Sequence, residues 1–175
     1  LQIPVPTPTE LSRLFATFAP VLEIDQVDRN DQIGIPGLSA EGEPFVDVSD
    51  PVVFVRTAHT RFGDQTLLQL VYSFWFPARP PMGPVDLLAG RLDGITWRVT
   101  LDNAGNPLLF DSIHNCGCYH MFFPTERLRQ RETSQSLEEP IFVPSRLTTW
   151  RPVERVVLRI EARTHYLQDV RQEGD

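Results

Sequence analysis

The stretch GITWRVTLDNAGNPLLFDSIH, residues 94–114, decides the fold class. Two runs in which apolar and polar residues alternate flank residues 102–106, which are Asp, Asn, Ala, Gly and Asn. Alternation with a period of two places the apolar side chains on one face of a strand, and Asn and Gly adopt the backbone angles of tight turns. The stretch therefore predicts a β-hairpin with one apolar face.

Similar patterns on both sides of this hairpin extend it into a sheet. Residues 52–62 and 66–76 are rich in β-branched and aromatic side chains and are separated by Gly63 and Asp64, which predicts a second hairpin. Residues 153–167 alternate again, and this pattern predicts a strand whose polar face carries Arg159, Glu161, Arg163 and His165. We expect a mainly β fold, an antiparallel sheet arranged as a sandwich or a partly closed barrel.

One short helix is predicted ahead of the strands, at residues 9–18. Thr7 or Thr9 is a suitable cap, Pro20 ends the helix, and the apolar residues recur at helical spacing at Leu11, Leu14, Phe15 and Phe18. We expect residues 1–8 to form a Pro-rich entry segment and residues 9–170 a single globular domain. Residues 25–50 are rich in turn formers and predict an irregular loop, in which the acidic side chains of Asp25, Asp28 and Asp31 are solvated.

Composition narrows the classes of function. The chain of 175 residues is 41% hydrophobic and 22% charged, which suits a globular domain, and its net charge of −7 disfavours a nucleic-acid partner. All 16 basic residues are Arg, so chemistry that needs a lysine is excluded. The chain opens on LQIPVPTPTE, and a Pro- and Thr-rich entry of this kind is common after a signal peptide or membrane anchor. We expect an extracytoplasmic domain, periplasmic or tethered to a membrane upstream of residue 1, with a small-molecule or envelope partner.

The chemistry is concentrated in SIHNCGCYHMFF, residues 112–123, where both cysteines of the chain and two of its four histidines alternate as His114, Cys116, Cys118 and His120. On a straight strand these four side chains would span about 20 Å, too far to share one ion. Gly117 can bend the chain between the cysteines and bring them together. A Cys-x-Cys pair rarely closes on itself, so the spacing gives no expectation of a disulfide.

A transition-metal site is the function that this segment favours. Thiolate and imidazole ligands suit zinc, copper or iron rather than magnesium or calcium. His59 and His165 have similar Arg- and Thr-flanked contexts near predicted strand ends, so we expect one or both to complete the site built on residues 114–120. A metalloenzyme would use a metal-bound water, and Asp93 or Asp111 would orient the ligands.

Two alternatives belong to other classes. The first is a metal-free thiol enzyme, a hydrolase or transferase, in which Cys118 is the nucleophile, His120 or His59 the base, and Asp93 or Asp111 the orienting group. The second is a binding or scaffold domain without chemistry, in which the cysteines pack as small apolar side chains. The glycine-rich nucleotide motifs, the serine-hydrolase elbow and the zinc-protease helix motif are absent from the sequence, which disfavours those enzyme classes.

Overall fold

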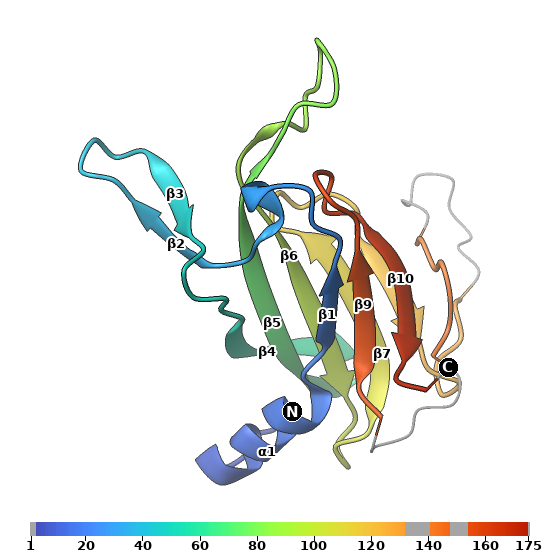
Figure 1. Cartoon of the computed structure of the whole chain (residues 1–175). Coiled ribbons are helices and arrows are strands. Elements are labelled where there is room, and N and C mark those ends of the chain that lie inside the picture. The colour runs from blue at the N-terminus through green and yellow to red at the C-terminus, as the bar shows by residue number, and fades with distance from the viewer. Residues whose placement is uncertain (1–2, 132–140, 148–153, 175) are drawn as a thin grey trace.

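The computed structural model describes residues 3–131, 141–147 and 154–174, and these residues form three β-sheets, one α-helix and one 3-10 helix (Figure 1). The predicted mainly β fold is confirmed. The elements are, in chain order, α1 (Pro8–Phe18), β1 (Val21–Ile24), η1 (Arg29–Asp31), β2 (Ile35–Leu38), β3 (Pro44–Asp47), β4 (Phe54–Phe62), β5 (Gln65–Arg79), β6 (Gly90–Leu101), β7 (Pro107–His114), β8 (Met121–Pro124), β9 (Val156–Ile160) and β10 (Leu167–Gln172).

The largest sheet has the strand order β4-β5-β6-β7-β8, and every neighbouring pair in it is antiparallel. Both predicted hairpins are present, β4 with β5 and β6 with β7. The register aligns Leu70 with Val99 and Val99 with Phe110, so apolar side chains of three strands form a row on one face. All three of these residues are completely buried, and we call this the inner face of the sheet.

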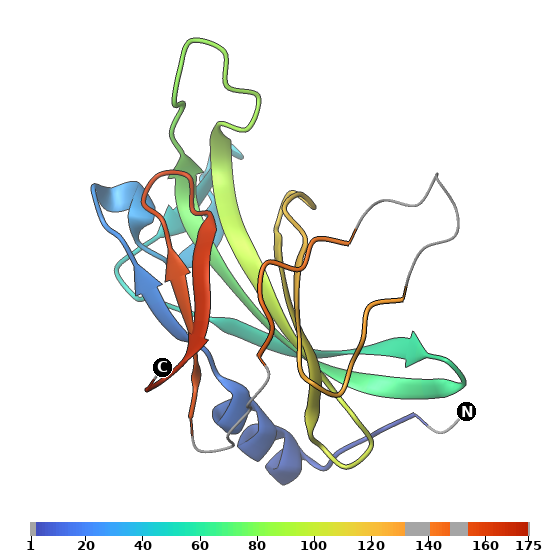
Figure 2. The ribbon, with the colours of Figure 1, turned by 90° about the vertical axis from the view of Figure 1, so that its right-hand side faces the viewer.

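A second sheet of β1, β9 and β10 packs against the inner face (Figure 2). In it β1 runs parallel to β9, and β10 runs antiparallel to β9. Leu158 and Ile160 of β9 and Val170 of β10 join the same buried cluster as Phe74 of β5 and Trp97 of β6. The sheets do not close into a barrel, and the molecule is a two-layer, sandwich-like fold.

Helix α1 lies at one end of the sandwich, as predicted for residues 9–18, and begins at Pro8. Thr7 caps it: its side chain accepts a hydrogen bond from the backbone N–H of Glu10, whose carboxylate accepts in turn from the Thr7 backbone. The helix is fixed to the large sheet because the Tyr72 hydroxyl donates to the Phe15 carbonyl over 2.9 Å. No helix among the described residues has the length and apolar character needed to cross a membrane.

The prediction of an irregular loop at residues 25–50 was wrong. The segment forms η1 and the β2–β3 hairpin, a separate two-stranded sheet. Its strands have four residues each, and β2 contains Pro36 and Gly37, so the composition resembles that of a turn. The prediction that Asp31 is solvated was also wrong, because Asp31 is completely buried.

The predicted strand at residues 153–167, described from residue 154 onward, ends early. Strand β9 stops at Ile160, and a turn follows in which Arg163 and His165 have φ angles of 68° and 52°. These left-handed angles interrupt the alternation, so odd and even positions no longer mark opposite faces. His165 is therefore completely buried, in contrast to its predicted place on the polar face.

Gly34 joins the β2–β3 hairpin to the large sheet, because its N–H donates to the Trp75 carbonyl over 3.0 Å. A Cβ atom at Gly34 would lie 1.9 Å from the Asp47 carbonyl oxygen, which belongs to the backbone. We expect Gly34→Ala to lower the free energy of unfolding by about 1–3 kcal/mol, the usual cost of forced overpacking, in urea denaturation. Gly83→Ala is the control, because its added Cβ would meet nothing within 4 Å. Equal unfolding midpoints for the two variants would contradict this account of the hairpin.

Candidate functional site

The segment that carries the cysteines forms the turn between β7 and β8. The N–H of His114 donates to the Cys118 carbonyl over 3.0 Å, and the N–H of Gly117 donates to the His114 carbonyl over 2.8 Å. Gly117 has a φ of 89°, a left-handed angle that glycine adopts without strain. The predicted bend at Gly117 is confirmed.

This bend brings the two sulfur atoms into bonding distance, and Cys116 and Cys118 form a disulfide. Closed Cys-x-Cys pairs are rare, and this chain is an exception, because the left-handed Gly117 turns both side chains to the same side. Cys116 and Gly117 are exposed and Cys118 is half-buried. A disulfide sulfur is neither a thiolate ligand nor a nucleophile, so in this oxidation state Cys116 and Cys118 can serve neither of the roles predicted for them.

His114 and Asp93 extend the inner face at the end of the core. The register places His114 opposite Ile95 and Asp93 opposite Phe76, both of which are core residues. Asp93 contacts two imidazoles: its Oδ1 lies 3.5 Å from His114 Nδ1, and its Oδ2 lies 2.7 Å from His165 Nδ1. The turn after β9 thus brings His165 beside His114, with the Asp93 carboxylate between them.

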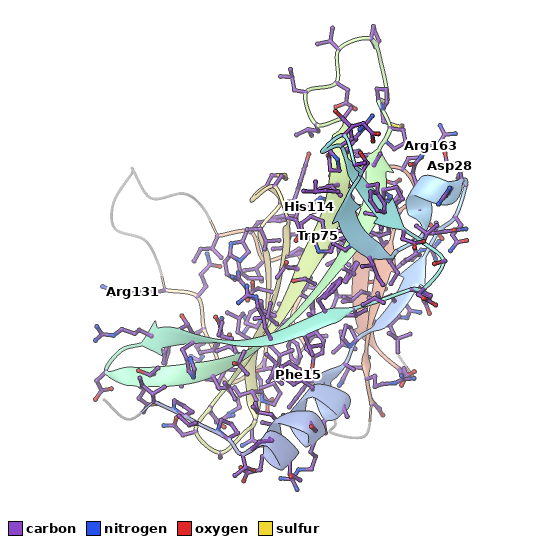
Figure 3. The ribbon with its side chains drawn as sticks, turned by 90° about the vertical axis from the view of Figure 1, so that its left-hand side faces the viewer. Phe15, Asp28, Trp75, His114, Arg131 and Arg163 are labelled. Carbon is purple, nitrogen blue, oxygen red and sulfur yellow. A yellow bond between two sulfur atoms is a disulfide. The ribbon has the colours of Figure 1, made fainter. Side chains whose placement is uncertain are left out.

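Asp31 completes this group from the other side of His165. Its Oδ1 lies 3.4 Å from His165 Nε2, and its carboxylate accepts backbone N–H groups of Val27, Asp28 and Arg163. Figure 3 shows Asp28 and Arg163 at the same end of the molecule as His114, away from Phe15 of α1. We call Asp31, Asp93, His114 and His165 the buried His–Asp cluster, because their side chains are between 0% and 11% exposed.

In both carboxylates, several hydrogen bonds together outweigh the effect of burial on the pKa. Burial alone would raise the pKa of Asp93, but hydrogen bonds from His114, His165 and the Gly94 backbone hold that pKa well below its usual value. Burial likewise opposes ionisation of Asp31, yet the three backbone N–H groups and His165 hold its pKa below the usual value. Both carboxylates are therefore ionised at neutral pH.

The backbone around the cluster is strained. Among the described residues, four that are not glycine have a left-handed φ: Leu92, Tyr119, Arg163 and His165. Leu92 precedes Asp93 in the chain, Arg163 donates its N–H to Asp31, and the ring of Tyr119 lies 5.4 Å from that of His114. Such strain concentrates at functional sites, where the surrounding contacts must hold it. Because all four of these strained residues lie at or beside the buried His–Asp cluster, we take this end of the sandwich as the candidate site.

Two tyrosines and an arginine connect the buried cluster to the cysteine turn. The Tyr166 hydroxyl donates to the Tyr119 hydroxyl, and Arg79 Nη1 donates to the Tyr166 hydroxyl over 3.1 Å. Arg79 also lies over the Tyr166 ring, 4.8 Å from its centroid, in a cation–π contact. Tyr119 directly follows Cys118, so these contacts tie the disulfide turn to the residues that surround His114.

His120 faces the opposite side of the sheet, the outer face. Its Nε2 lies 3.1 Å from Asp111 Oδ1 and 2.9 Å from Arg98 Nη2, while Arg98 Nε donates to the same Asp111 oxygen over 2.6 Å. Arg98 and Asp111 are direct cross-strand neighbours on β6 and β7. The two histidines that flank the cysteines therefore belong to separate groups, each held by an aspartate.

His59 lies at the other end of the large sheet. It pairs with Leu68, which pairs with Leu101 at the β6 end far from Ile95 and His114. The His59 ring contacts the Pro4 carbonyl over 3.1 Å, so the structure does not bring it to residues 114–120. Within the described part of the chain, no three His, Cys, Asp or Glu side chains are arranged to hold a metal ion. The metal site stays a prediction from the sequence.

Sequence reasoning did not identify Asp31, Tyr166 or Arg79 as site residues. The spacing of Asp28 and Asp31 is that of a capping box, and Asp31 does accept the Asp28 N–H, so this signal was available. No pattern marked Tyr166 or Arg79, whose side chains meet from positions 87 residues apart. Comparison of the chain with models of protein families, with curated proteins and with solved structures finds no match.

Proposed function

We propose that this protein is a thiol–disulfide exchange domain whose redox centre is the Cys116–Cys118 pair. The observation that supports the proposal is a solvent-accessible disulfide confined to one turn. A three-residue ring stabilises a fold by roughly 1.6 kcal/mol, compared with about 3 kcal/mol for a 15-residue loop. The β7–β8 ladder already joins the strands on both sides. A disulfide that adds little stability and is open to solvent belongs to the labile, reactive class.

The exchange proceeds through a mixed disulfide with a partner dithiol. A partner thiolate attacks the sulfur of Cys116, the S–S bond breaks, and Cys118 leaves as a thiolate that takes up a proton. The partner's second thiolate then attacks the partner's first sulfur, which is bonded to Cys116 in the mixed disulfide, and displaces the Cys116 thiolate, which is also protonated. Two electrons and two protons pass from the partner dithiol to this chain, and the partner leaves as a disulfide.

Exposure decides which sulfur is attacked. Cys116 is exposed, whereas Cys118 is half-buried and its carbonyl is held by the His114 N–H. The buried His–Asp cluster fixes His114, so the turn keeps its shape when the disulfide opens and the two thiols stay close enough to re-form it. The cluster is thus a positioning device for the redox turn. We place the domain in an oxidising, extracytoplasmic compartment, where disulfides persist, with an envelope protein dithiol as its partner.

The test measures the thiol state of the folded protein in glutathione redox buffers. We expect wild type to equilibrate between disulfide and dithiol at glutathione ratios near those of an oxidising compartment, and to oxidise a reduced dithiol peptide. Cys118→Ser should accumulate a mixed disulfide with glutathione at Cys116, detected by mass spectrometry. Cys116→Ser should form it about tenfold more slowly, because Cys118 is less accessible.

Two results would overturn the proposal. One is a disulfide that resists glutathione and opens only with excess dithiothreitol, which would make it a structural crosslink. The other is exchange no faster than in the chemically unfolded chain. The Cys116→Ser/Cys118→Ser double variant is the control without any thiol, since the sequence contains no further cysteine. Its melting temperature should lie close to that of wild type.

A further inference from the structure

Strand β4 lies at the edge of the large sheet, and one side of its backbone faces no partner strand among the described residues. It pairs with β5 over all nine of its residues, Phe54–Phe62. Its far end projects beyond β6, because β5 pairs with β6 only from Leu68 onward, and Figure 3 shows this end of the hairpin extending away from the rest of the sheet. Pro4 of the entry segment contacts the ring of His59, not the β4 backbone. A free strand edge of this kind is a template for pairing with another chain.

Strand β4 lacks most of the features that prevent such pairing. It contains no Pro or Gly, and its register with β5 is continuous, without a bulge. Apolar side chains accompany the free edge, because Phe54, Val55 and Phe62 are 41%, 51% and 56% exposed. The strand also carries two exposed arginines, Arg56 and Arg61. The positions of these arginines therefore decide which pairings the edge allows.

The turn after β4 determines which backbone groups point to the free edge. Gly63 and Asp64 form a two-residue turn. The two residues that flank such a turn, here Phe62 and Gln65, occupy a hydrogen-bonded position of the antiparallel pair. Because hydrogen-bonded and non-hydrogen-bonded positions alternate, the even-numbered residues of β4 direct their N–H and C=O groups to β5. The odd-numbered residues direct theirs to the free edge, and they are Val55, Thr57, His59 and Arg61.

We propose that β4 pairs with β4 of a second copy of this chain, antiparallel about a two-fold axis at Ala58, so that the two large sheets form one continuous sheet. This register overlaps all nine residues of both strands and places odd-numbered residues opposite odd-numbered ones, so the free N–H and C=O groups of the two copies meet. It also places Phe54 opposite Phe62 of the second copy, and a shift by two residues loses both of these aromatic pairs. The proposal is independent of the redox turn, because β4 contains no cysteine.

The two arginines permit this register and oppose others. Arg56 lies opposite Thr60 of the second copy, and Arg61 lies opposite Val55, so no two like charges face each other. Registers that place Arg56 opposite Arg56, or Arg61 opposite Arg61, bring like charges together and are destabilised. The strand is thus complementary to itself, which indicates a second copy as the partner in a closed two-fold dimer. A strand-to-strand interface is small, so we expect a dissociation constant of roughly 1–100 µM.

The first test reverses one charge and measures the dimer by sedimentation velocity at rising protein concentration. Val55 lies opposite Arg61 in the proposed register, so Val55→Glu adds cross-strand ion pairs and Val55→Arg adds like-charge pairs. We expect Val55→Glu to dimerise at least about tenfold more tightly than Val55→Arg. Net charge alone predicts the opposite order, because the chain is already at −7 and Glu makes it more negative. Equal unfolding midpoints in urea show that both variants remain folded.

The second test places a thiol at the two-fold axis, in the Cys116→Ser/Cys118→Ser background. In Ala58→Cys the two introduced thiols face each other, and a Cα separation of about 4.5 Å lies within the range for a disulfide. Arg56→Cys is the matched control on the same face, since its thiols are offset by about 13 Å along the strand. We expect oxidation to link Ala58→Cys into a covalent dimer at least about tenfold faster than Arg56→Cys. Chance collisions would favour Arg56→Cys, because position 56 is more exposed than position 58.

Three results would overturn the proposal. One is a chain that remains monomeric at a concentration of about 1 mM. Another is a Val55→Arg dimer as tight as that of Val55→Glu, or equal crosslinking of Ala58→Cys and Arg56→Cys, either of which excludes the two-fold register. The third is growth beyond a dimer as the concentration rises. That growth would mean that β4 pairs with a different edge of the next copy, because such head-to-tail pairing does not close.

Discussion

Replacement of Asp31 by Asn is expected to lower the free energy of unfolding by about 3–5 kcal/mol, the cost of removing one partner from a buried ionic group. The Asp31 carboxylate accepts backbone N–H groups of Val27, Asp28 and Arg163 and contacts the completely buried His165. An amide cannot satisfy all these donors, because its nitrogen is itself a donor. The variant would also leave His165 with a single carboxylate neighbour, Asp93.

Asp25→Asn is the matched control for this prediction. Asp25 follows β1 and forms an ion pair with Arg159, in which both side chains are about half exposed, 51% and 53%. An exposed pair of this kind contributes between 0 and about 1 kcal/mol. Urea denaturation at neutral pH measures the free energy of unfolding of both variants. Similar losses for Asp31→Asn and Asp25→Asn would show that the buried cluster does not anchor the η1 segment to the turn after β9.

The large sheet was predictable because the residues that determine its hairpins are close together in the sequence. The turn at residues 102–106 forms from its own side chains: Asp102 accepts the N–H groups of Ala104 and Asn106, and Gly105 has a φ of 83°. The strands on both sides alternate, apart from one register shift at Thr100 and Leu101 next to the turn. Where turn chemistry and period agree over neighbouring residues, a hairpin follows from the sequence alone.

The second sheet depends on partners that are distant in the chain. Strand β1 has four residues and pairs in parallel with β9, with Val21 opposite Val157. No turn connects the two strands, and a run of four residues has too little periodicity to indicate a strand. The β2–β3 hairpin was missed for a related reason, because Pro36 and Gly37 favour turns and the bridge from Gly34 to Trp75 is long-range.

The candidate site was predictable in position but not in architecture. The alternation of His and Cys drew attention to residues 114–120, which do form the turn beside the buried cluster. Asp31 seemed solvated because charged residues in turn-rich segments usually are, and its burial depends on Arg163, 132 residues away. His165 seemed exposed because the strand pattern was extended past Ile160. Two residues with left-handed φ, Arg163 and His165, end that pattern, and neither is a residue type that favours such angles.

We expect acid to lower the free energy of unfolding because it protonates Asp93. The pH range of this loss follows from the pKa of Asp93, which is lower in the folded chain than in the unfolded chain. The pKa of the folded-state carboxyl lies below its usual value, which is about 3.9 in an unfolded chain. Its contribution to stability is therefore complete above about pH 4 and is lost as the pH falls toward the folded-state pKa. A carboxyl whose pKa is lower by one in the folded chain than in the unfolded chain adds about 1.4 kcal/mol to the free energy of unfolding at neutral pH.

Asp93→Asn removes this contribution, so we expect the variant to be much less stable than wild type at pH 7 and the difference to narrow steadily below about pH 4. The physical reason is that the unfolded wild-type chain binds a proton at Asp93 below about pH 4, whereas the folded chain, in which His165 and His114 contact this carboxylate, does so only at lower pH. The free energy that wild type gains from the ionised carboxylate, which the variant lacks, therefore falls as the pH falls. Urea denaturation between pH 7 and about pH 2 measures the narrowing, with Asp25→Asn as the control for the loss of one negative charge. Parallel curves for wild type and Asp93→Asn over this range would mean that the Asp93 carboxylate gains nothing from its two histidines.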